Sequence, residues 1–273
     1  MATIAIAREL GALGEELAAE LAHSTGFTVI DREHLESRLA ALGLNPEKHQ
    51  KYDERKPGLW ASLSQERDDY LHYLKLILFE EAAAGSCVVL GRGAGVILQS
   101  MPNLASIRVT APMAERISRI RKSFACDERH ALQLIEQSDH DRSGFHKYFF
   151  SIDWHDPRNY GLVINMGEFS LEDAAKIVDD YRRIVSSEER ERAGIIRAKE
   201  LLLGQRVVTE IVYVRKIPIH FLEAEARGGR VTLHGVANTE GVIEEALATA
   251  RSVPGVDETE STIQVVQEFT VMP

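Results

Sequence analysis

The sequence predicts an α/β protein in which helices cover both faces of a parallel sheet, followed by a smaller α+β domain. Over residues 1–185, short strands that are apolar throughout alternate with amphipathic helices, which is typical of parallel sheets buried on both faces. After residue 210 the order changes to a hairpin, one helix and a last strand. The highly charged stretch 186–203 separates the two patterns.

The first part contains five predicted strands and the helices between them. Leu17, Ala18 and Leu21 form one apolar stripe of the first helix, and Gly26 follows as a typical helix-ending glycine. The strands are predicted at residues 2–7, 27–30, 87–90, 105–110 and 160–165. Further helices are predicted at residues 33–42, 63–84, 114–124 and 171–185, with an irregular stretch at 45–60.

In the second part, two alternating segments flank Gly228-Gly229, a strong hairpin signal. We place a domain boundary near residue 190 because the composition changes there. The expected division is a first domain at 1–188, a charged helical linker or first helix of the next domain at 189–209, and a second domain at 210–273. Its predicted elements are strands 219–226 and 230–236, helix 238–251 and strand 261–266.

Charge and composition exclude several classes of function. The net charge is −10, and an acidic chain argues against non-specific nucleic-acid binding, which depends on clustered Lys and Arg. No apolar run approaches the roughly 20 residues that span a bilayer, so we expect no membrane insertion. The start, MATIAIAREL, is not typical of a signal peptide. Cys87 and Cys126 form no disulfide pattern, which favours a reducing, cytoplasmic location.

The turn between the first strand and the first helix, Arg8 to Gly14, is the first candidate site. A glycine-rich turn that opens a helix presents unpaired backbone N–H groups and a positive dipole end, which suit phosphate oxygens. However, the chain has no lysine before Lys48, and Glu15 and Glu16 would repel a phosphate chain. The spacing alone therefore leaves two interpretations open, a phosphate site and an ordinary strand-to-helix turn.

Gly91-Arg92-Gly93 follows the apolar strand 87–90. This position raises a guanidinium at the carboxyl edge of the sheet, where open α/β folds bind their ligands. Arginine recognises phosphate with two parallel hydrogen bonds. We therefore favour a binding role for Arg92 over a packing role, because an arginine between two glycines has little around it to pack against.

A cationic helix follows the next strand. Arg116 and Arg119 share one helix face, and Arg121, Lys122 and, further on, Arg142 add positive charge. Phosphoryl transfer needs such charge, because negative charge spreads over the oxygens of the moving group. A solvated helix face explains the same pattern, and both interpretations stay open.

His140, His146 and His155 raise the question of a metal site. Their spacing fits no common zinc-ligand set and no thiol lies nearby in the sequence, so we expect no metal-ligating residues here. Trp154 is expected to be a packing anchor.

Five motifs in order resemble the cytidylate kinase-like family of nucleoside monophosphate kinases. They are IARELGALGEELA, VIDRE, VVLGRGAGVIL, the Arg-rich helix, and the D..R and DW.DP..Y.LVIN patterns, and they extend over residues 1 to 185. The resemblance implies a P-loop kinase fold that transfers the γ-phosphoryl group of ATP to CMP or dCMP with Mg²⁺. Nucleotides are thus the implied partners.

The resemblance also implies roles for single residues. Arg8, Gly11, Ala12 and Gly14 would bind ATP phosphates. The residues that would bind the acceptor nucleotide are Asp31, Arg32, Gly91, Arg92 and Asp139, and those that would act catalytically from the lid are Arg116, Arg119 and Arg142.

Two departures from the family pattern leave alternatives open. Glu15 replaces an arginine near the helix start, and Leu13 replaces a glycine. The first alternative to a kinase is a non-catalytic nucleotide sensor that signals through the C-terminal domain. The second is a kinase for a different phosphorylated acceptor.

The C-terminal part resembles a BON domain, on the pieces GGRVTLHG, the following helix and PGV before the last strand. Residues 210–273 are net acidic, which argues against attraction to anionic lipid headgroups. We expect this domain to bind a regulatory ligand or to form a homo-oligomer.

Overall fold

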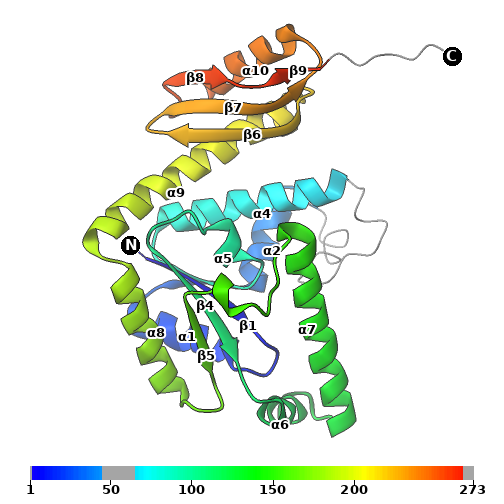
Figure 1. The fold of residues 1–273 in the computed structure, drawn as a ribbon, viewed down its shortest axis with the longest axis vertical. Coiled ribbons are helices and arrows are strands. Elements are labelled where there is room, and N and C mark those ends of the chain that lie inside the picture. The colour runs from blue at the N-terminus through cyan, green and yellow to red at the C-terminus, as the bar shows by residue number, and fades with distance from the viewer. Residues whose placement is uncertain (1, 45–64, 267–273) are drawn as a thin grey trace, which may run out of the picture. The chain divides into compact units, whose positions relative to one another are not determined.

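The computed structural model describes residues 2–44 and 65–266. The chain divides into two compact units, Met1–Ile195 and Ile196–Pro273. Each unit has its own sheet and its own apolar core (Figure 1).

The first unit is built on a five-stranded parallel sheet in the order β2-β3-β1-β4-β5, which confirms the predicted sheet. Its strands are continuous apolar segments, as expected for a sheet with two covered faces. The strands are β1 (Thr3–Arg8), β2 (Thr28–Ile30), β3 (Cys87–Leu90), β4 (Leu104–Thr110) and β5 (Leu162–Asn165).

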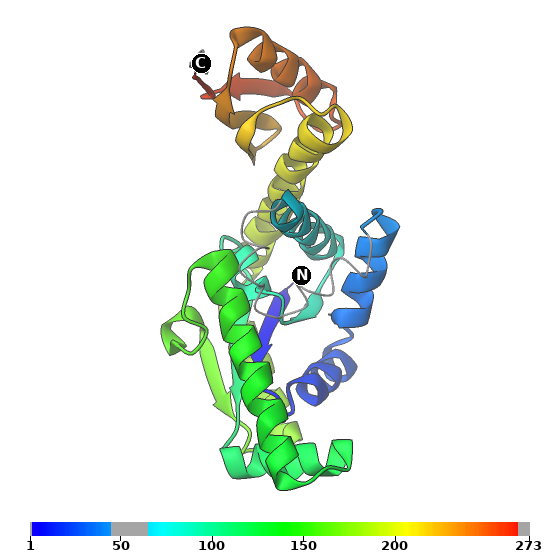
Figure 2. The same ribbon diagram turned by 90° about the vertical axis from the view of Figure 1, so that its right-hand side faces the viewer.

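Helices lie on both faces of this sheet (Figures 1 and 2). Ile4 and Ile6 of β1 point to the face covered by α1 and α8, where they join the main core. Ala5 points to the other face, against α5. The helices are α1 (Gly14–Thr25), α2 (Arg32–Ala41), α4 (Gln65–Ala84), α5 (Ala94–Ile97), α6 (Met113–Phe124), α7 (Glu128–Phe150) and α8 (Leu171–Val185), with the short η3 (Pro157–Asn159).

The chain marks the helix ends with polar caps and glycine. Asp31 accepts a hydrogen bond from the backbone N–H of His34 at 2.9 Å and so begins α2. Gly26 ends α1 with a left-handed φ of 73°, and its N–H bonds to the carbonyl of Ala22. These ends fix where the chain leaves the sheet edge, which positions the candidate site.

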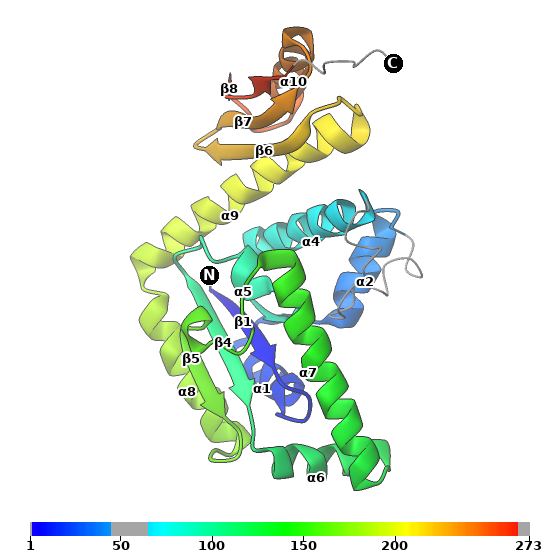
Figure 3. The same ribbon diagram turned by 45° about the vertical axis from the view of Figure 1, so that its right-hand side comes forward.

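Helix α7 is the largest element that the sequence analysis did not identify. Asp127 caps its start and Ser151 ends it with a φ of 58°. Figure 2 shows α7 as a long rod beside the sheet, joined to α6 at one end, and α4 lies against α2 and α5 (Figure 3). The predicted irregular stretch 45–60 and the first two residues of the predicted helix 63–84 lie outside the described residues.

The second unit is a small α+β domain on a four-stranded sheet. Gly228 and Gly229, with φ of 53° and 84°, make the predicted hairpin turn between β6 and β7. The helices cover one face of the sheet around Val207, Val231 and Ala246. The elements are the end of α9 (Glu188–Val208), the π-helical η4 (Thr209–Val214), β6 (His220–Arg227), β7 (Arg230–Ala237), α10 (Glu240–Ser252), β8 (Glu258–Ser261) and β9 (Gln264–Val265).

The predicted last strand at 261–266 is only partly correct, since β9 lies within it but is a separate, shorter strand. The structure has two shorter strands, β8 and β9, which pair in parallel with different parts of β7. The ladder is interrupted because Ile263 turns into the core, and its N–H bonds to the hydroxyl of Ser261 at 3.1 Å instead of to a strand.

Candidate functional site

The candidate site lies where β1 and β3 end side by side. The chain leaves β1 for α1 on one face of the sheet, and it leaves β3 for α5 on the other face. Adjacent strands whose connections run to opposite faces open a crevice at their carboxyl ends, and open α/β proteins bind ligands there. Arg8 ends β1, and Gly91-Arg92-Gly93 follows β3, so both predicted motifs flank this crevice.

The turn between β1 and α1, residues 9–13, faces this crevice. Gly11 and Leu13 have left-handed φ angles of 78° and 62°, which bend the chain sharply into α1. Within the described residues, the backbone N–H groups of Gly14, Glu15 and Glu16 have no hydrogen-bond acceptor. The start of α1 therefore offers unpaired donors and the positive end of its dipole to an anion.

Arg8 lies directly over the start of α1. A Cβ atom on Gly14 would lie 2.5 Å from both Cβ and Cγ of Arg8, so only glycine allows this approach. The Nε atom of Arg8 is 2.9 Å from a carboxylate oxygen of Glu15, and the Arg8 side chain is largely buried. Arg8 of β1 thus places a positive charge beside the start of α1, where α1 itself has no lysine.

A cleft of about 530 Å³ opens beside this turn. It has the size of a small-molecule site. It brings together five of the predicted site residues, Arg8, Asp31, Arg32, Arg92 and Arg142. Its other lining residues are Leu10, Glu15, Glu33, Leu90, Leu134, Gln137, Ser138 and Asp141.

Arg92 is held in a strained backbone conformation at the cleft. Its φ is 54°, between two glycines that are also left-handed. Contrary to the expectation that Arg92 has little to pack against, its side chain is only 5% exposed. Its Nη1 donates to the hydroxyl of Tyr70 at 3.2 Å, and its Nη2 is 4.0 Å from Glu36. The guanidinium is therefore held at the cleft wall by α4 and α2.

Other predicted residues have contacts within the protein. Asp31 lines the cleft and also caps α2. Nε of Arg32 lies 2.7 Å from a carboxylate oxygen of Glu36. Gly11 and Ala12 lie in the β1–α1 turn, and Gly91 precedes Arg92 without lining the cleft.

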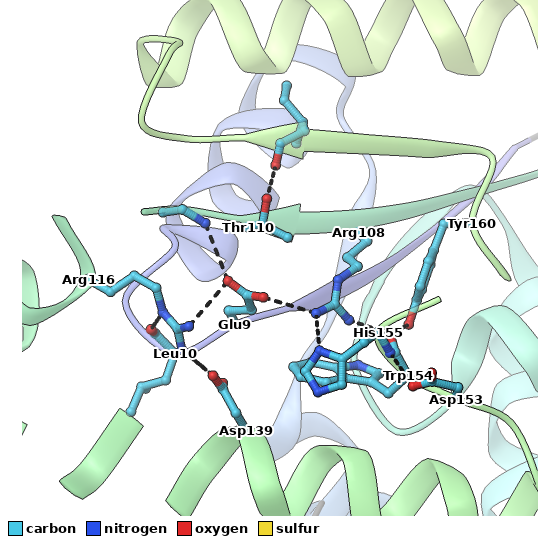
Figure 4. A network of polar contacts seen from close by, with 12 residues as sticks. Glu9, Leu10, Arg108, Thr110, Arg116, Asp139, Asp153, Trp154, His155 and Tyr160 are labelled. Carbon is cyan, nitrogen blue, oxygen red and sulfur yellow. Dashed lines mark hydrogen bonds and ion pairs between the residues drawn. The ribbon is translucent and has the colours of Figure 1, made fainter. Parts of the chain in front are cut away.

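A network of charged side chains lies behind the turn (Figure 4). Glu9 accepts a hydrogen bond from Nη2 of Arg108 at 3.0 Å and pairs with Nη1 of Arg116 at 3.3 Å. Arg116 also donates from Nη2 to both oxygens of Asp139, each at 2.8 Å. Both arginines are almost fully buried, and the two carboxylates balance their charge.

Arg108 is enclosed on its other side by aromatic residues. Its guanidinium carbon lies 4.0 Å from the centre of the Trp154 ring, and Trp154 is 1% exposed, which confirms the predicted packing anchor. The Tyr160 hydroxyl donates to the carbonyl of Trp154 at 2.9 Å. Burial has the largest effect on Tyr160 and raises its pKa above the usual value, although the charge of Arg108 acts in the opposite direction. Tyr160 therefore acts here as a neutral hydrogen-bond donor.

Two of the three predicted lid arginines contact the turn rather than the cleft. Nε of Arg116 donates to the carbonyl of Leu10 at 2.8 Å, and Nη1 of Arg119 donates to the carbonyl of Gly11 at 3.2 Å. Asp139, predicted to bind the acceptor, holds Arg116. Of the predicted catalytic arginines, Arg142 lines the cleft, while Arg116 and Arg119 do not. Their catalytic roles stay predictions.

Sequence reasoning missed Glu9, Tyr70 and Glu36. Glu9 directly follows the first strand, and this position at the carboxyl edge of the sheet was enough to mark it as a candidate site residue. Tyr70 and Glu36 reach Arg92 from distant helices, and no local pattern shows such contacts. In the described residues no three His, Cys, Asp or Glu side chains gather into a metal cluster.

The parallel five-stranded sheet in the order β2-β3-β1-β4-β5, with helices on both faces, resembles the fold of P-loop kinases. A family model described as the cytidylate kinase-like family matches residues 3–168, and the chain belongs to this family. A second family model, described as the BON domain, matches residues 200–267. These residues include the four-stranded sheet of the second unit.

Several solved structures are similar to this chain over the first unit, and the first of them shares its fold. A structure of an uncharacterized protein from Eubacterium ventriosum has a TM-score of 0.54 at 22% identity, covering 67% of this chain and 98% of its own. A gluconokinase from Sinorhizobium meliloti has a TM-score of 0.44 at 15% identity, covering 70% and 97%. A shikimate kinase from Bacteroides thetaiotaomicron has a TM-score of 0.40 at 13% identity, covering 66% and 97%. A search of curated proteins found no match.

Among the helices of the described residues, none combines the length and the apolar character needed to cross a membrane.

Proposed function

We propose that this protein transfers the γ-phosphoryl group of ATP to a nucleoside monophosphate, with CMP or dCMP as the acceptor that family membership favours. The observation that carries the proposal is the cleft at the ends of β1 and β3. It gathers Arg8, Arg32, Arg92 and Arg142 beside the unpaired N–H groups at the start of α1. Such an arrangement suits phosphate groups on both sides of one cleft.

In this proposal the two walls of the cleft have different tasks. Arg8 and the N–H groups of α1 bind the ATP phosphates, while Arg92 and Arg32 hold the acceptor phosphate. An oxygen of the acceptor phosphate attacks the γ-phosphorus, the bond to the β,γ-bridging oxygen breaks, and ADP leaves. Arg142 stabilises the charge on the moving group. Because the nucleophile is already an anion, positioning and charge carry the catalysis.

The cleft also fits a magnesium ion bound with the nucleotide. Mg²⁺ binds through one or two carboxylates and the substrate phosphates rather than through a complete protein cage. Of the four carboxylates that line the cleft, Glu15, Glu33 and Asp141 would hold it, while Asp31 caps α2. When bound, the ion neutralises phosphate charge.

A coupled assay of ADP release with CMP, dCMP, UMP and AMP tests the kinase proposal. We expect turnover with at least one of these acceptors. Arg92→Lys keeps the charge but loses the fork-shaped donor set, so it should raise KM for the acceptor about 10-fold and leave KM for ATP unchanged. Arg129→Lys, at an exposed position of α7, is the matched control. Absence of turnover with all four acceptors would contradict a nucleoside monophosphate kinase of this specificity.

One observation favours a second candidate, a nucleotide sensor without turnover. Glu15 already pairs with Arg8, the cation that lies over the start of α1. A sensor would bind ATP or a monophosphate in calorimetric titration but release no ADP. In that case the BON-domain unit would carry the signal, through a regulatory ligand or a second copy of the chain.

A further inference from the structure

Helix α6 places two arginines against the back of the β1–α1 turn. Arg116 donates to the carbonyl oxygen of Leu10 at 2.8 Å, and Arg119 donates to the carbonyl oxygen of Gly11 at 3.2 Å. We call these two arginines and two carbonyl groups the carbonyl clamp. Its hydrogen bonds hold two consecutive peptide units of the turn that borders the cleft.

The clamp fixes the direction of the turn's peptide planes. In a trans peptide the N–H group points away from the carbonyl of the preceding residue. Because the Leu10 carbonyl points to α6, the Gly11 N–H points away from α6. Because the Gly11 carbonyl also points to α6, the Ala12 N–H lies on the other side, where it donates to the carbonyl of Glu9 at 3.2 Å.

The clamp arginines are themselves held by other groups. Arg116 is 3% exposed and uses Nε for Leu10, Nη2 for Asp139 and Nη1 for Glu9. Arg119 uses its second Nη atom for the carbonyl of Met166 at 2.9 Å. A guanidinium that has all of these partners would have to break several hydrogen bonds before it could turn to a ligand in the cleft.

The clamp also connects two walls of the cleft. Asp139, which holds Arg116, lies on α7, the helix that presents Gln137, Asp141 and Arg142 to the cleft. Glu9, the other carboxylate on Arg116, begins the β1–α1 turn (Figure 4). The position of α7 and the shape of the turn are therefore set by one network.

We propose that Arg116 and Arg119 are positioning residues, which set the affinity of the β1–α1 turn for phosphate through its main chain without touching the phosphate. The proposal rests on the proposed function, since it concerns the same anion site. It assigns to these arginines a different task from that of lid residues that contact the transferring group.

Arg119→Met in the full chain tests the clamp, with Arg121→Met as control. Arg119 is partly exposed, so its loss should leave the fold intact, and Arg121 is an exposed residue of the same helix. We expect Arg119→Met to weaken binding of inorganic phosphate and of ATP equally, by about 10-fold in calorimetric titration, as the loss of one such hydrogen bond implies. Arg121→Met should bind as the wild type does.

Amide hydrogen exchange gives a second readout that needs no ligand. Loss of the clamp should speed exchange of the Ala12 amide in Arg119→Met and leave it unchanged in Arg121→Met. Unchanged phosphate affinity with slower turnover would show that Arg119 acts on the transferring group, and would overturn the proposal. If the wild type binds no phosphate or ATP, the proposed function fails, and unchanged Ala12 exchange would overturn the clamp separately.

Discussion

Two residues other than glycine, Leu13 and Arg92, have left-handed backbones at the two strand ends that border the cleft. Their φ angles are 62° and 54°. This conformation costs each of them about 1–2 kcal/mol, which the surrounding contacts must offset. Leu13 packs against the main core and Arg92 is held by Tyr70. Backbone strain at both sides of one cleft supports a binding role for this sheet edge.

Glu15 should oppose anion binding at the start of α1. Its carboxylate lies 2.9 Å from Nε of Arg8, so it competes with a phosphate for the same cation. We expect Glu15→Gln to tighten binding of inorganic phosphate without magnesium about 5-fold, measured by calorimetry. Glu16→Gln, at the next exposed position, is the control and should change the affinity less. Weaker binding by Glu15→Gln would show instead that Glu15 supports the ligand.

His72 should make the protein sensitive to acid. Burial, with a smaller contribution from Lys75, lowers the pKa of His72 from 6.5 to about 4. The unfolded chain therefore binds a proton at higher pH than the folded chain, and stability falls as the pH drops from 6.5 to 4. The full loss is about 3 kcal/mol. Chemical unfolding of His72→Gln across this range should show a flatter pH dependence, whereas His130→Gln, at an exposed position, should keep the wild-type slope.

At the scale of elements, the start of α1 depends on how closely β1 approaches it. Arg8 crosses Gly14 at a distance that leaves no room for a side chain. The α6–α7 pair then holds the turn from behind, through Arg116 and Asp139. The proposed anion site thus combines two consecutive elements, β1 and α1, with the α6–α7 pair, which lies far from them in the sequence.

Gly14→Ala tests this close approach. In an open helix, replacing glycine by alanine stabilises by up to about 1 kcal/mol. Here the new Cβ would lie 2.5 Å from Cβ and Cγ of Arg8, so we expect lower stability in thermal unfolding and weaker phosphate binding. Gly241→Ala near the start of α10 is the control, since its nearest neighbour would be 3.9 Å away. Equal gains in stability at both sites would contradict the close approach.

At the scale of the whole molecule, the two units have separate cores. Ile4, Leu17 and Val88 belong to the core of the first unit, and Val231 and Ala246 to that of the second. The cleft residues and the carbonyl clamp all belong to the first unit. The proposed binding site therefore lies within one unit.

Val231→Ala tests this independence. Val231 is 0% exposed, so its truncation should destabilise the second unit by about 2 kcal/mol. In calorimetric unfolding we expect one transition to move to lower temperature, with unchanged phosphate affinity. Val88→Ala, at an equally buried site, should move the other transition. A single transition that shifts with both variants would show that the units unfold together.

The parallel sheet, the hairpin at Gly228-Gly229 and the motifs at Arg8 and Arg92 can be predicted from residue order alone, because apolar periodicity, turn glycines and strand-end positions are local signals. Residue order did not determine the break between β8 and β9, which depends on how Ile263 packs. The contacts of Arg116 and Arg119 with the β1–α1 turn, and those of Tyr70 and Glu36 with Arg92, become visible only in the folded chain. Which of several distant groups a guanidinium contacts depends on three-dimensional geometry and burial, and residue spacing does not encode either of these.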